Sequence, residues 1–440
     1  MEPRGLDAMR PARWRPRRLH FHLSLWSLVA ILVISLGLVL SSMALTGRVV
    51  VLPGWVTERV TDELNSALPT GTVSLARVEA GLTPGGRPRL RLVDVGLRDA
   101  SGLSLAQLNA VEMSLSRRAA LKGQLVPSYI ELQGAQVTLR RLQNGAFDLA
   151  LGQNVGATGN LAALLDQLDA LFETGPIARV AWLGATDLTV TLEDARSGRI
   201  WQVTDGTLDV IPQEAFIDTN VQFNVFNQTE ELASINFAFR SARDSSEASL
   251  SLRFDNAAAR DIAAQSPVMA FLSVIDAPIS GALRSSVNPD GGLEELAGAL
   301  QIGAGGLSPV PGAPPAKFDG ARIYIDFDPS RQRINFTGAA LESEIGSFAA
   351  EGHVYLADFQ GGWPNSLIGQ VDIPHATLSP PDFFAAPLEI DSGTADLRVR
   401  LDPFQIEFGQ IVAYRGANRY EARGKLGADG TGWWISLDTG

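Results

Sequence analysis

Apolar and polar residues alternate along most of the chain beyond residue 70. Val111, Met113 and Leu115 are separated by Glu112 and Ser114, and the same period of two recurs at intervals toward the C-terminal part. Successive side chains of a strand point to opposite faces of a sheet, so the pattern predicts strands with one apolar and one wet face. Strands of this kind are typical of antiparallel sheets.

The alternating apolar positions define a single candidate surface if the strands join into one sheet. Such a surface must meet another sheet, a helix or an apolar ligand, because exposed apolar area is costly in water. Its predicted members are Val111, Met113, Leu115, Leu188, Val190, Leu192, Val221, Phe223, Val225, Ile235, Phe237, Phe239, Leu250, Leu252, Phe254, Ile323, Ile325, Phe327, Leu397, Val399 and Leu401.

Turn dipeptides such as Asn144-Gly145 and Asp290-Gly291 separate the runs at hairpin spacing. Amphipathic patterns predict short helices over 55–68, 160–172 and 257–275, the last with a break at Pro267, and a helical turn over 382–386. The Pro-rich stretch 308–315 predicts a loop or linker. These helices are too few to cover so much sheet, so some apolar face either closes on another sheet or stays open as a groove.

One segment, 23–45, lacks charged residues altogether. As a helix it would be about 35 Å long, enough to cross a bilayer. The preceding 22 residues hold six arginines against Glu2 and Asp7, and only Arg48 follows closely, which places the N-terminus in the cytoplasm. A cleaved signal peptide with a weak site at 42–44 is the alternative, but the run exceeds the usual length of about 7–15 apolar residues.

Composition excludes several functional classes. The formal net charge of -12 lacks the basic footprint of a nucleic-acid binder. The first 22 residues carry +4, which leaves -16 for the residues after the apolar run. Cysteine is absent and only four histidines occur, which excludes disulfides and thiolate chemistry. His353 and His375 lack metal-ligand spacing, and no nucleophile or acid–base motif is present. We expect no catalytic residue, metal or cofactor, and therefore no enzyme.

The order of several motifs resembles the bacterial AsmA-like family, especially its long YhdP-like members. The stretches are LRLVDVGLRDASGLSLAQLNAVEMSLS (90–116), ALKGQLVPSYIELQGAQVTLRR (120–141), NGAFDL (144–149), TVTLEDARSGRIWQVTDGTLDV (189–210) and APISGALRSSVNPDGGLEELAGALQIGAGGL (277–307). Each motif is degenerate, and their order carries the specificity. Long members extend well beyond 440 residues, so we expect either a fragment of a longer protein or a short member.

The resemblance implies a mostly β protein with one N-terminal transmembrane helix, followed by an elongated, twisted antiparallel sheet that forms a groove. The predicted organisation is a cytoplasmic tail over 1–22, a transmembrane helix over 23–46, an N-terminal AsmA-like β unit over 47–176 and further β-groove repeats over 177–440. The protein would sit in the bacterial inner membrane, with most of the chain in the periplasm.

The resemblance also implies a function: carrying phospholipid, or another acyl lipid, between the inner and outer membranes and so contributing to outer-membrane lipid homeostasis. The apolar positions given above would line the lipid groove, and a partner in the periplasm or outer membrane is left open. Charge substitutions such as Ile325→Glu are expected to block lipid passage without unfolding the sheet. The alternative is a non-enzymatic envelope scaffold whose sheets close into β-sandwiches with dry cores.

Overall fold

The computed structural model describes residues 31–438 except 36, 39–40, 43–44, 68–70, 99–101, 103, 121, 123, 125, 143–146, 149–171, 173–176, 196–197, 227–231, 244, 291 and 380–385. These residues form one sheet of 24 strands, a second sheet of three strands and a few short helices. The chain is therefore mostly β, as the alternation predicts.

The strands are 2 to 14 residues long, and the predicted apolar positions lie within them except Leu401. They are β1 (Val49–Val51), β2 (Thr72–Ser74), β3 (Arg77–Leu82), β4 (Pro88–Arg98), β5 (Ser104–Leu115), β6 (Pro127–Gln133), β7 (Gln136–Arg141), β8 (Phe147–Asp148), β9 (Trp182–Asp194), β10 (Arg199–Pro212), β11 (Phe216–Val225), β12 (Ala233–Ala242), β13 (Ala248–Ala258), β14 (Ile275–Asp276), β15 (Pro278–Val287), β16 (Leu296–Ile302), β17 (Gly305–Leu307), β18 (Ala316–Phe318), β19 (Gly320–Asp328), β20 (Arg333–Ser343), β21 (Gly346–Ala357), β22 (Ser366–Leu378), β23 (Leu388–Ile390), β24 (Ser392–Arg400), β25 (Gln405–Arg415), β26 (Asn418–Asp429) and β27 (Gly432–Asp438).

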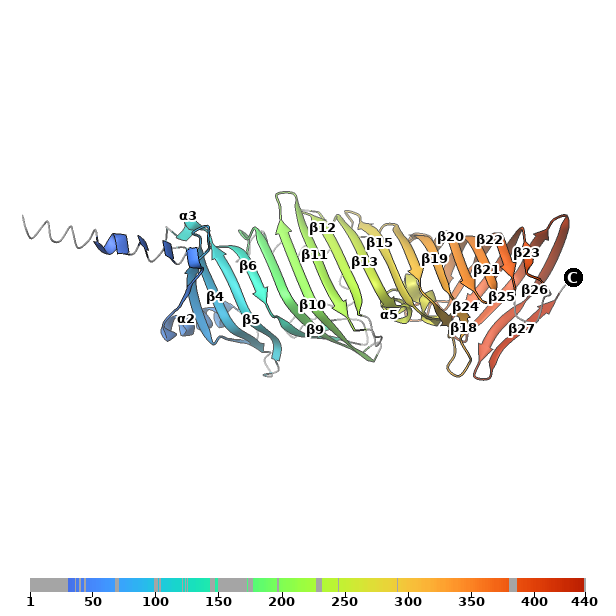
Figure 1. The fold of residues 1–440 in the computed structure, drawn as a ribbon, viewed down its shortest axis with the longest axis horizontal. Coiled ribbons are helices and arrows are strands. Elements are labelled where there is room, and N and C mark those ends of the chain that lie inside the picture. Colours follow the sequence, from blue (N-terminus) through green and yellow to red (C-terminus); the bar gives the residue numbers. More distant parts are fainter. Residues whose placement is uncertain are drawn as a thin grey trace, which may run out of the picture.

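Strands of the large sheet lie side by side nearly in chain order. From β9 onward each strand pairs with the next strand of that sheet, except that β22 pairs with both β23 and β24. The ladder runs through β10, β11, β12, β13, β15, β16, β19, β20, β21, β22, β24, β25, β26 and β27. The molecule is elongated as a result, and its colours run in order from one end to the other (Figure 1). The ladder is continuous across the predicted boundary at 176.

One place departs from the expected antiparallel sheet. β9 runs parallel to β6 and β7, which together form one broken strand beside β5. Parallel neighbours require a crossover that returns the chain to the opposite edge of the sheet. The connection between Arg141 and Trp182 is long enough to make it. The sheet is therefore mixed, with all its other pairings antiparallel in the part of the chain that the structure describes.

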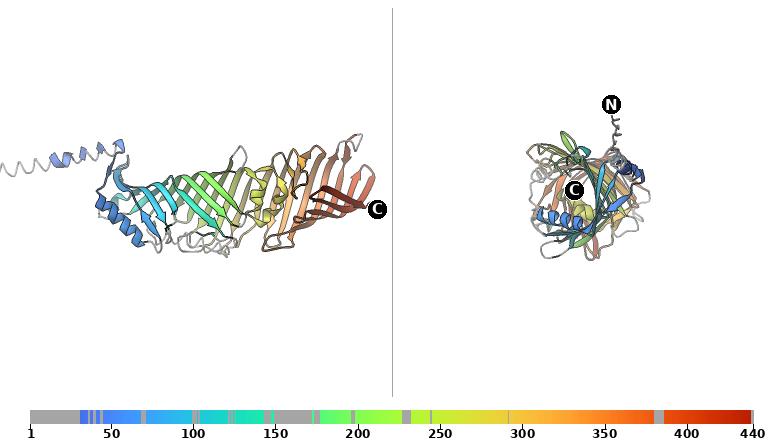
Figure 2. Two further views of the ribbon diagram at one scale, coloured as in Figure 1. Left: turned by 90° about the horizontal axis from the view of Figure 1, so that it is seen from below. Right: turned by 90° about the vertical axis from the view of Figure 1, so that its left-hand side faces the viewer.

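Viewed along its long axis, the sheet curls around that axis (Figure 2). β-Bulges contribute to this curl, because an extra residue in one strand increases the local twist. Asp187, Asp205 and Asn256 have left-handed backbone conformations at or next to register shifts. Asn and Asp tolerate this conformation better than other residues with a Cβ atom, which explains these residue types at the bulges.

The predicted helix at 55–68 is confirmed as α2 (Gly54–Ala67). Its residues Val60 and Leu64 pack against Val78 and Leu92 of β3 and β4, so α2 caps the first end of the sheet. The short helix α3 (Arg117–Ala120) joins β5 to β6.

Several predicted helices lie wholly or partly outside the described residues. Of the helix predicted over 160–172 only Phe172 is described; it is helical and buried. The turn over 382–386 lies outside except for residue 386. Much of the predicted span over 23–46 also lies outside, and its described positions from residue 31 onward are helical. Within the described residues, no helix combines the length and apolarity needed to cross a membrane.

Candidate functional site: the apolar inner face

The sheet has an apolar inner face, which we define by one row of directly paired residues. The register joins one residue per strand from β10 to β26 without interruption. The row is Leu208, Val221, Phe237, Leu252, Leu283, Gly298, Ile325, Phe336, Gly352, Val371, Ala395, Ile411 and Ala422. Parallel rows flank it, such as Phe223, Ile235 and Phe254 on adjacent strands. Because every member except the two glycines is apolar, the face is continuous along the axis.

The predicted lining residues are all buried or half-buried, but they do not form one compact site. Phe223, Phe254 and Ile325 belong to a large central cluster, together with Val225, Ile235, Leu252, Ile323, Phe327 and Val399. Val111 and Met113 pack in a separate cluster near α2, and Phe239 and Leu250 pack in a third. Leu401 follows β24 and packs near the last strands. The remaining residues of the set, Leu115, Leu188, Val190, Leu192, Val221, Phe237 and Leu397, lie on β5, β9, β11, β12 and β24.

A helical insertion covers the middle of the inner face. We call it the plug: α5 (Ala259–Ala263) and the 3-10 helix η1 (Pro267–Val274), which begins at the predicted break. Leu272 of the plug is 0% exposed and packs in the central cluster with Phe254 and Ile325. The apolar pattern of 257–275 predicts a helix, but nothing local in the sequence predicts that it folds onto the inner face. The sequence leaves open whether the apolar face is covered or stays open as a groove, and in the middle of the sheet the plug covers it.

The plug also changes the expectation for Ile325→Glu. Ile325 is 2% exposed within the central cluster. A carboxylate at this position would be buried without a partner, which is strongly destabilising. In place of the expectation that the fold survives, we therefore expect Ile325→Glu to destabilise the middle of the sheet.

A buried ion pair lies next to the plug. Arg141 of β7 approaches Asp194 of β9 with 3.8 Å between the Nη1 and Oδ2 atoms, and the Asp194 residue is 2% exposed. The Arg141 guanidinium also donates a hydrogen bond of 2.9 Å to Oε1 of Gln265, which lies between α5 and η1. Arg141 therefore links β7, in the N-terminal part of the sheet, to the plug.

The connection 308–315 forms a strap toward the last strands. It joins β17 to β18 of the small sheet, and its Val310 and Ala313 pack with Phe404 and Trp433. The Trp433 indole donates a hydrogen bond of 2.7 Å to the backbone oxygen of Pro314. The predicted loop is thus a packed cover for this part of the sheet.

At the last strand, β27, the inner face is exposed to solvent. Ile435 and Leu437 of β27 are 63% and 54% exposed, although they continue the rows that contain Leu426 and Gly424. The apolar face is therefore covered in the middle by the plug and accessible at the last strand.

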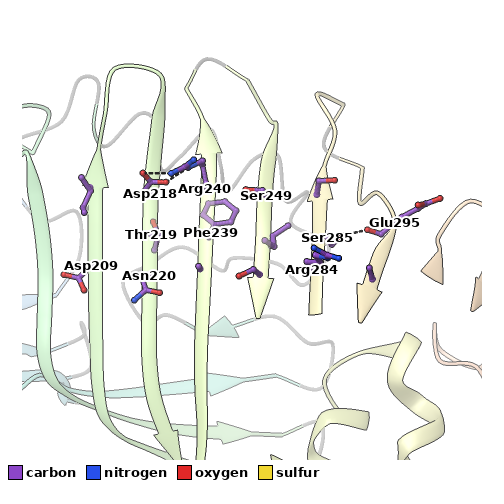
Figure 3. A pocket seen from close by; sticks show the side chains of 16 residues that line it. Asp209, Asp218, Thr219, Asn220, Phe239, Arg240, Ser249, Arg284, Ser285 and Glu295 are labelled. Carbon is purple, nitrogen blue, oxygen red and sulfur yellow. Dashed lines mark hydrogen bonds and ion pairs between the residues drawn. The ribbon is translucent and has the colours of Figure 1, made fainter. Parts of the chain in front are cut away.

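The outer face is polar, and the hollow drawn in Figure 3 lies on it. Its volume is about 700 Å³, and its lining includes Asp218, Asn220, Arg240 and Arg284 (Figure 3). Arg240 donates hydrogen bonds of 2.5 and 3.2 Å to Asp218, which raise the pKa of the guanidinium. The hollow therefore combines the Arg240–Asp218 ion pair with apolar lining residues such as Ile211 and Ala238.

The described residues hold no group of three or more side chains able to bind a metal ion. His353 packs edge-on against Tyr355, with ring centres 5.5 Å apart, and His375 approaches Glu389 at 3.4 Å. The two histidines lie on different strands and pair with other residues, so they do not converge.

Comparisons with known proteins give no match. No protein-family model, curated protein or solved structure is similar to the chain at a significant level.

Proposed function

We propose that this chain is a membrane-anchored, non-enzymatic protein that carries phospholipid between the inner and outer membranes along its inner face. In this proposal the segment 23–45 is the inner-membrane anchor, the sheet lies in the periplasm, and the resemblance to the AsmA-like family reflects common descent. The protein thereby contributes to lipid homeostasis of the outer membrane.

The observation that supports the proposal is the unbroken apolar row from Leu208 to Ala422. An acyl chain on this face gains about 25 cal/mol for each Å² of apolar surface that it removes from water, while the headgroup stays hydrated at the rim of the curled sheet. Transport then needs no reacting residue. It needs an accessible apolar surface without gaps. The paired row is unbroken from β10 to β26, and in this proposal the plug moves aside from its middle when a lipid passes.

Site-specific photocrosslinking tests the proposal. Phe237 lies on the inner face and is half-buried, whereas its neighbour Ala238 lies on the outer face of the same strand and lines the polar hollow. A photoreactive phenylalanine at position 237 of the full chain is expected to form phospholipid adducts in cells, detected by mass spectrometry. The same residue at 238 is the matched control. Equal yields at both positions, or none at 237, would refute the proposal.

A second candidate function is favoured by the plug. Because Leu272 and its neighbours fill the middle of the inner face, the sheet there has a closed apolar core, as an envelope scaffold requires. The two functions differ in one measurable respect. In a conduit, loosening the plug raises the rate of phospholipid transfer between vesicles, whereas in a scaffold transfer stays absent.

A further inference from the structure

Six basic side chains gather around the point where the chain enters the sheet. We call them the basic rim: Arg48 before β1, Arg87 between β3 and β4, Arg117, Arg118 and Lys122 between β5 and β6, and Arg179 before β9. All six are exposed. They come from four connections along one edge of the sheet, and α3, which contributes two of them, lies at the upper left corner of the sheet in Figure 1.

Specific contacts hold the four connections together. Arg89 donates a hydrogen bond of 3.2 Å to the backbone oxygen of Gly47, which places the turn before β4 beside the entering chain. The Arg117 guanidinium lies against Gly85 of that turn. Arg87 stacks over the ring of Tyr129 at 5.1 Å. Next to it, the backbone of residue 181 donates a hydrogen bond of 2.8 Å to that of residue 128.

The rim carries a concentration of positive charge. Residues 46–48, 83–87, 116–126 and 177–181 contain no acidic residue; the connection before β9 also holds Asp166, Asp169 and Glu173, which lie outside the described residues. Among the described residues none of the six forms an ion pair, whereas neighbouring Arg89 pairs with Glu112 at 3.0 Å. Six positive charges that form no ion pair within the described part of the chain therefore lie at one end of a body whose net charge after the apolar run is -16.

Farther along the same edge the charge reverses. The connections there carry the exposed acidic residues Glu214, Glu247, Asp290 and Glu294. An anionic surface would attract the first end of this edge and repel the remainder, so the sheet would stand away from such a surface instead of lying along it.

We infer that the basic rim binds the anionic phospholipid headgroups of the bilayer that the chain's own apolar segment enters. This inference rests on the membrane anchor of the proposed function. Only residues 46 and 47 separate the end of the apolar run from Arg48, so the rim begins about 10 Å from the bilayer, close to the screening length of about 8 Å at physiological salt. Each basic residue near an anionic surface strengthens binding on the order of fivefold.

The test places a fluorophore on the rim of the full chain reconstituted in nanodiscs. Because the chain has no cysteine, Gln124→Cys labels the rim without removing a charge, and Ser330→Cys labels a distant turn as control. The discs hold phosphatidylcholine alone or with one third phosphatidylglycerol, and both contain a lipid with a spin-labelled headgroup as quencher. We expect at least fivefold more quenching at position 124 in the anionic discs, lost when salt is raised to about 0.5 M.

Charge reversal supplies the variant. Arg117→Glu/Arg118→Glu/Lys122→Glu takes the rim from six positive charges to a net charge of zero and is expected to abolish the lipid dependence. Arg284→Glu/Arg322→Glu/Arg415→Glu makes the same charge change at exposed positions elsewhere and is expected to preserve it. Circular dichroism checks that the Arg117→Glu/Arg118→Glu/Lys122→Glu variant is folded. If it is not, the salt dependence of quenching in the chain with unaltered charges tests the headgroup contact.

The outcomes separate this inference from the proposed function. Quenching at position 124 that is independent of phosphatidylglycerol and of salt, in a chain retained by the discs, overturns the headgroup contact and leaves lipid transport standing. A chain that is not retained by the discs overturns the anchor and, with it, both proposals.

Discussion

Leu272→Ala is the most direct measure of how firmly the plug is packed. Leu272 is 0% exposed in the central cluster, where it lies among residues of the sheet. The substitution removes three carbon atoms, worth about 2.4 kcal/mol at ~0.8 kcal/mol for each methylene. The cavity left behind adds to this loss, for an expected total of about 3 kcal/mol.

Hydrogen exchange measures this loss where it occurs. In an elongated sheet whose strands contact mainly their neighbours, opening is local, so a global unfolding transition averages over regions that the plug does not touch. A loss of about 3 kcal/mol raises the opening equilibrium of η1 and of the strands beneath it more than about 100-fold. Mass spectrometry of peptides from η1, β13 and β15 measures this increase in exchange directly.

Leu293→Ala is the matched control, because Leu293 is 44% exposed in the connection before β16. We expect less than about 1 kcal/mol from this change. A protection loss below tenfold for Leu272→Ala, or equal losses for the two variants, would refute the conclusion that the plug is an integral part of the core.

Three further predictions follow from single contacts. Arg141→Met removes the cation that approaches the buried Asp194 carboxylate and should cost about 3 kcal/mol of local stability, measured by hydrogen exchange of β7 and β9; unchanged protection would argue against the buried pair. Trp433→Phe removes the hydrogen bond to Pro314, worth about 1 kcal/mol, and should speed proteolysis within 308–315; an unchanged cleavage rate would mean that the strap is held elsewhere. Gly352→Ala would place a Cβ atom 2.3 Å from a carbonyl oxygen of β22 at a φ of +149°, and should lower the unfolding temperature of the full chain clearly; wild-type stability would refute the close strand contact.

Alternation predicts strands over several runs, such as 221–225, 235–239, 250–254 and 323–327, and these runs lie in strands. Val221, Phe237, Leu252 and Ile325 are widely separated in sequence, yet the register joins them in one row, through Leu283 and Gly298. This success has a simple origin, because a period of two reflects the geometry of the strand itself. The lipid role of these residues remains a prediction.

What covers the apolar face could not be predicted in the same way. Arg141 meets Gln265 across 124 positions, and Pro314 meets Trp433 across 119. Contacts of this kind depend on how the whole sheet curls, which no local pattern reports. The basic rim could not be predicted from the sequence for the same reason. A net charge of -16 does not indicate which loops the topology brings together.

The order of the strands has a consequence for how the molecule forms. Because each strand from β10 onward meets a partner that precedes it closely in the chain, its contacts close short loops, which lowers the entropic barrier to pairing. Synthesis proceeds from the N-terminus, so the sheet can grow like a zipper, one strand at a time. At every stage, however, the newest strand presents an unpaired edge to its surroundings, and a pause in growth would leave that edge free to recruit another chain.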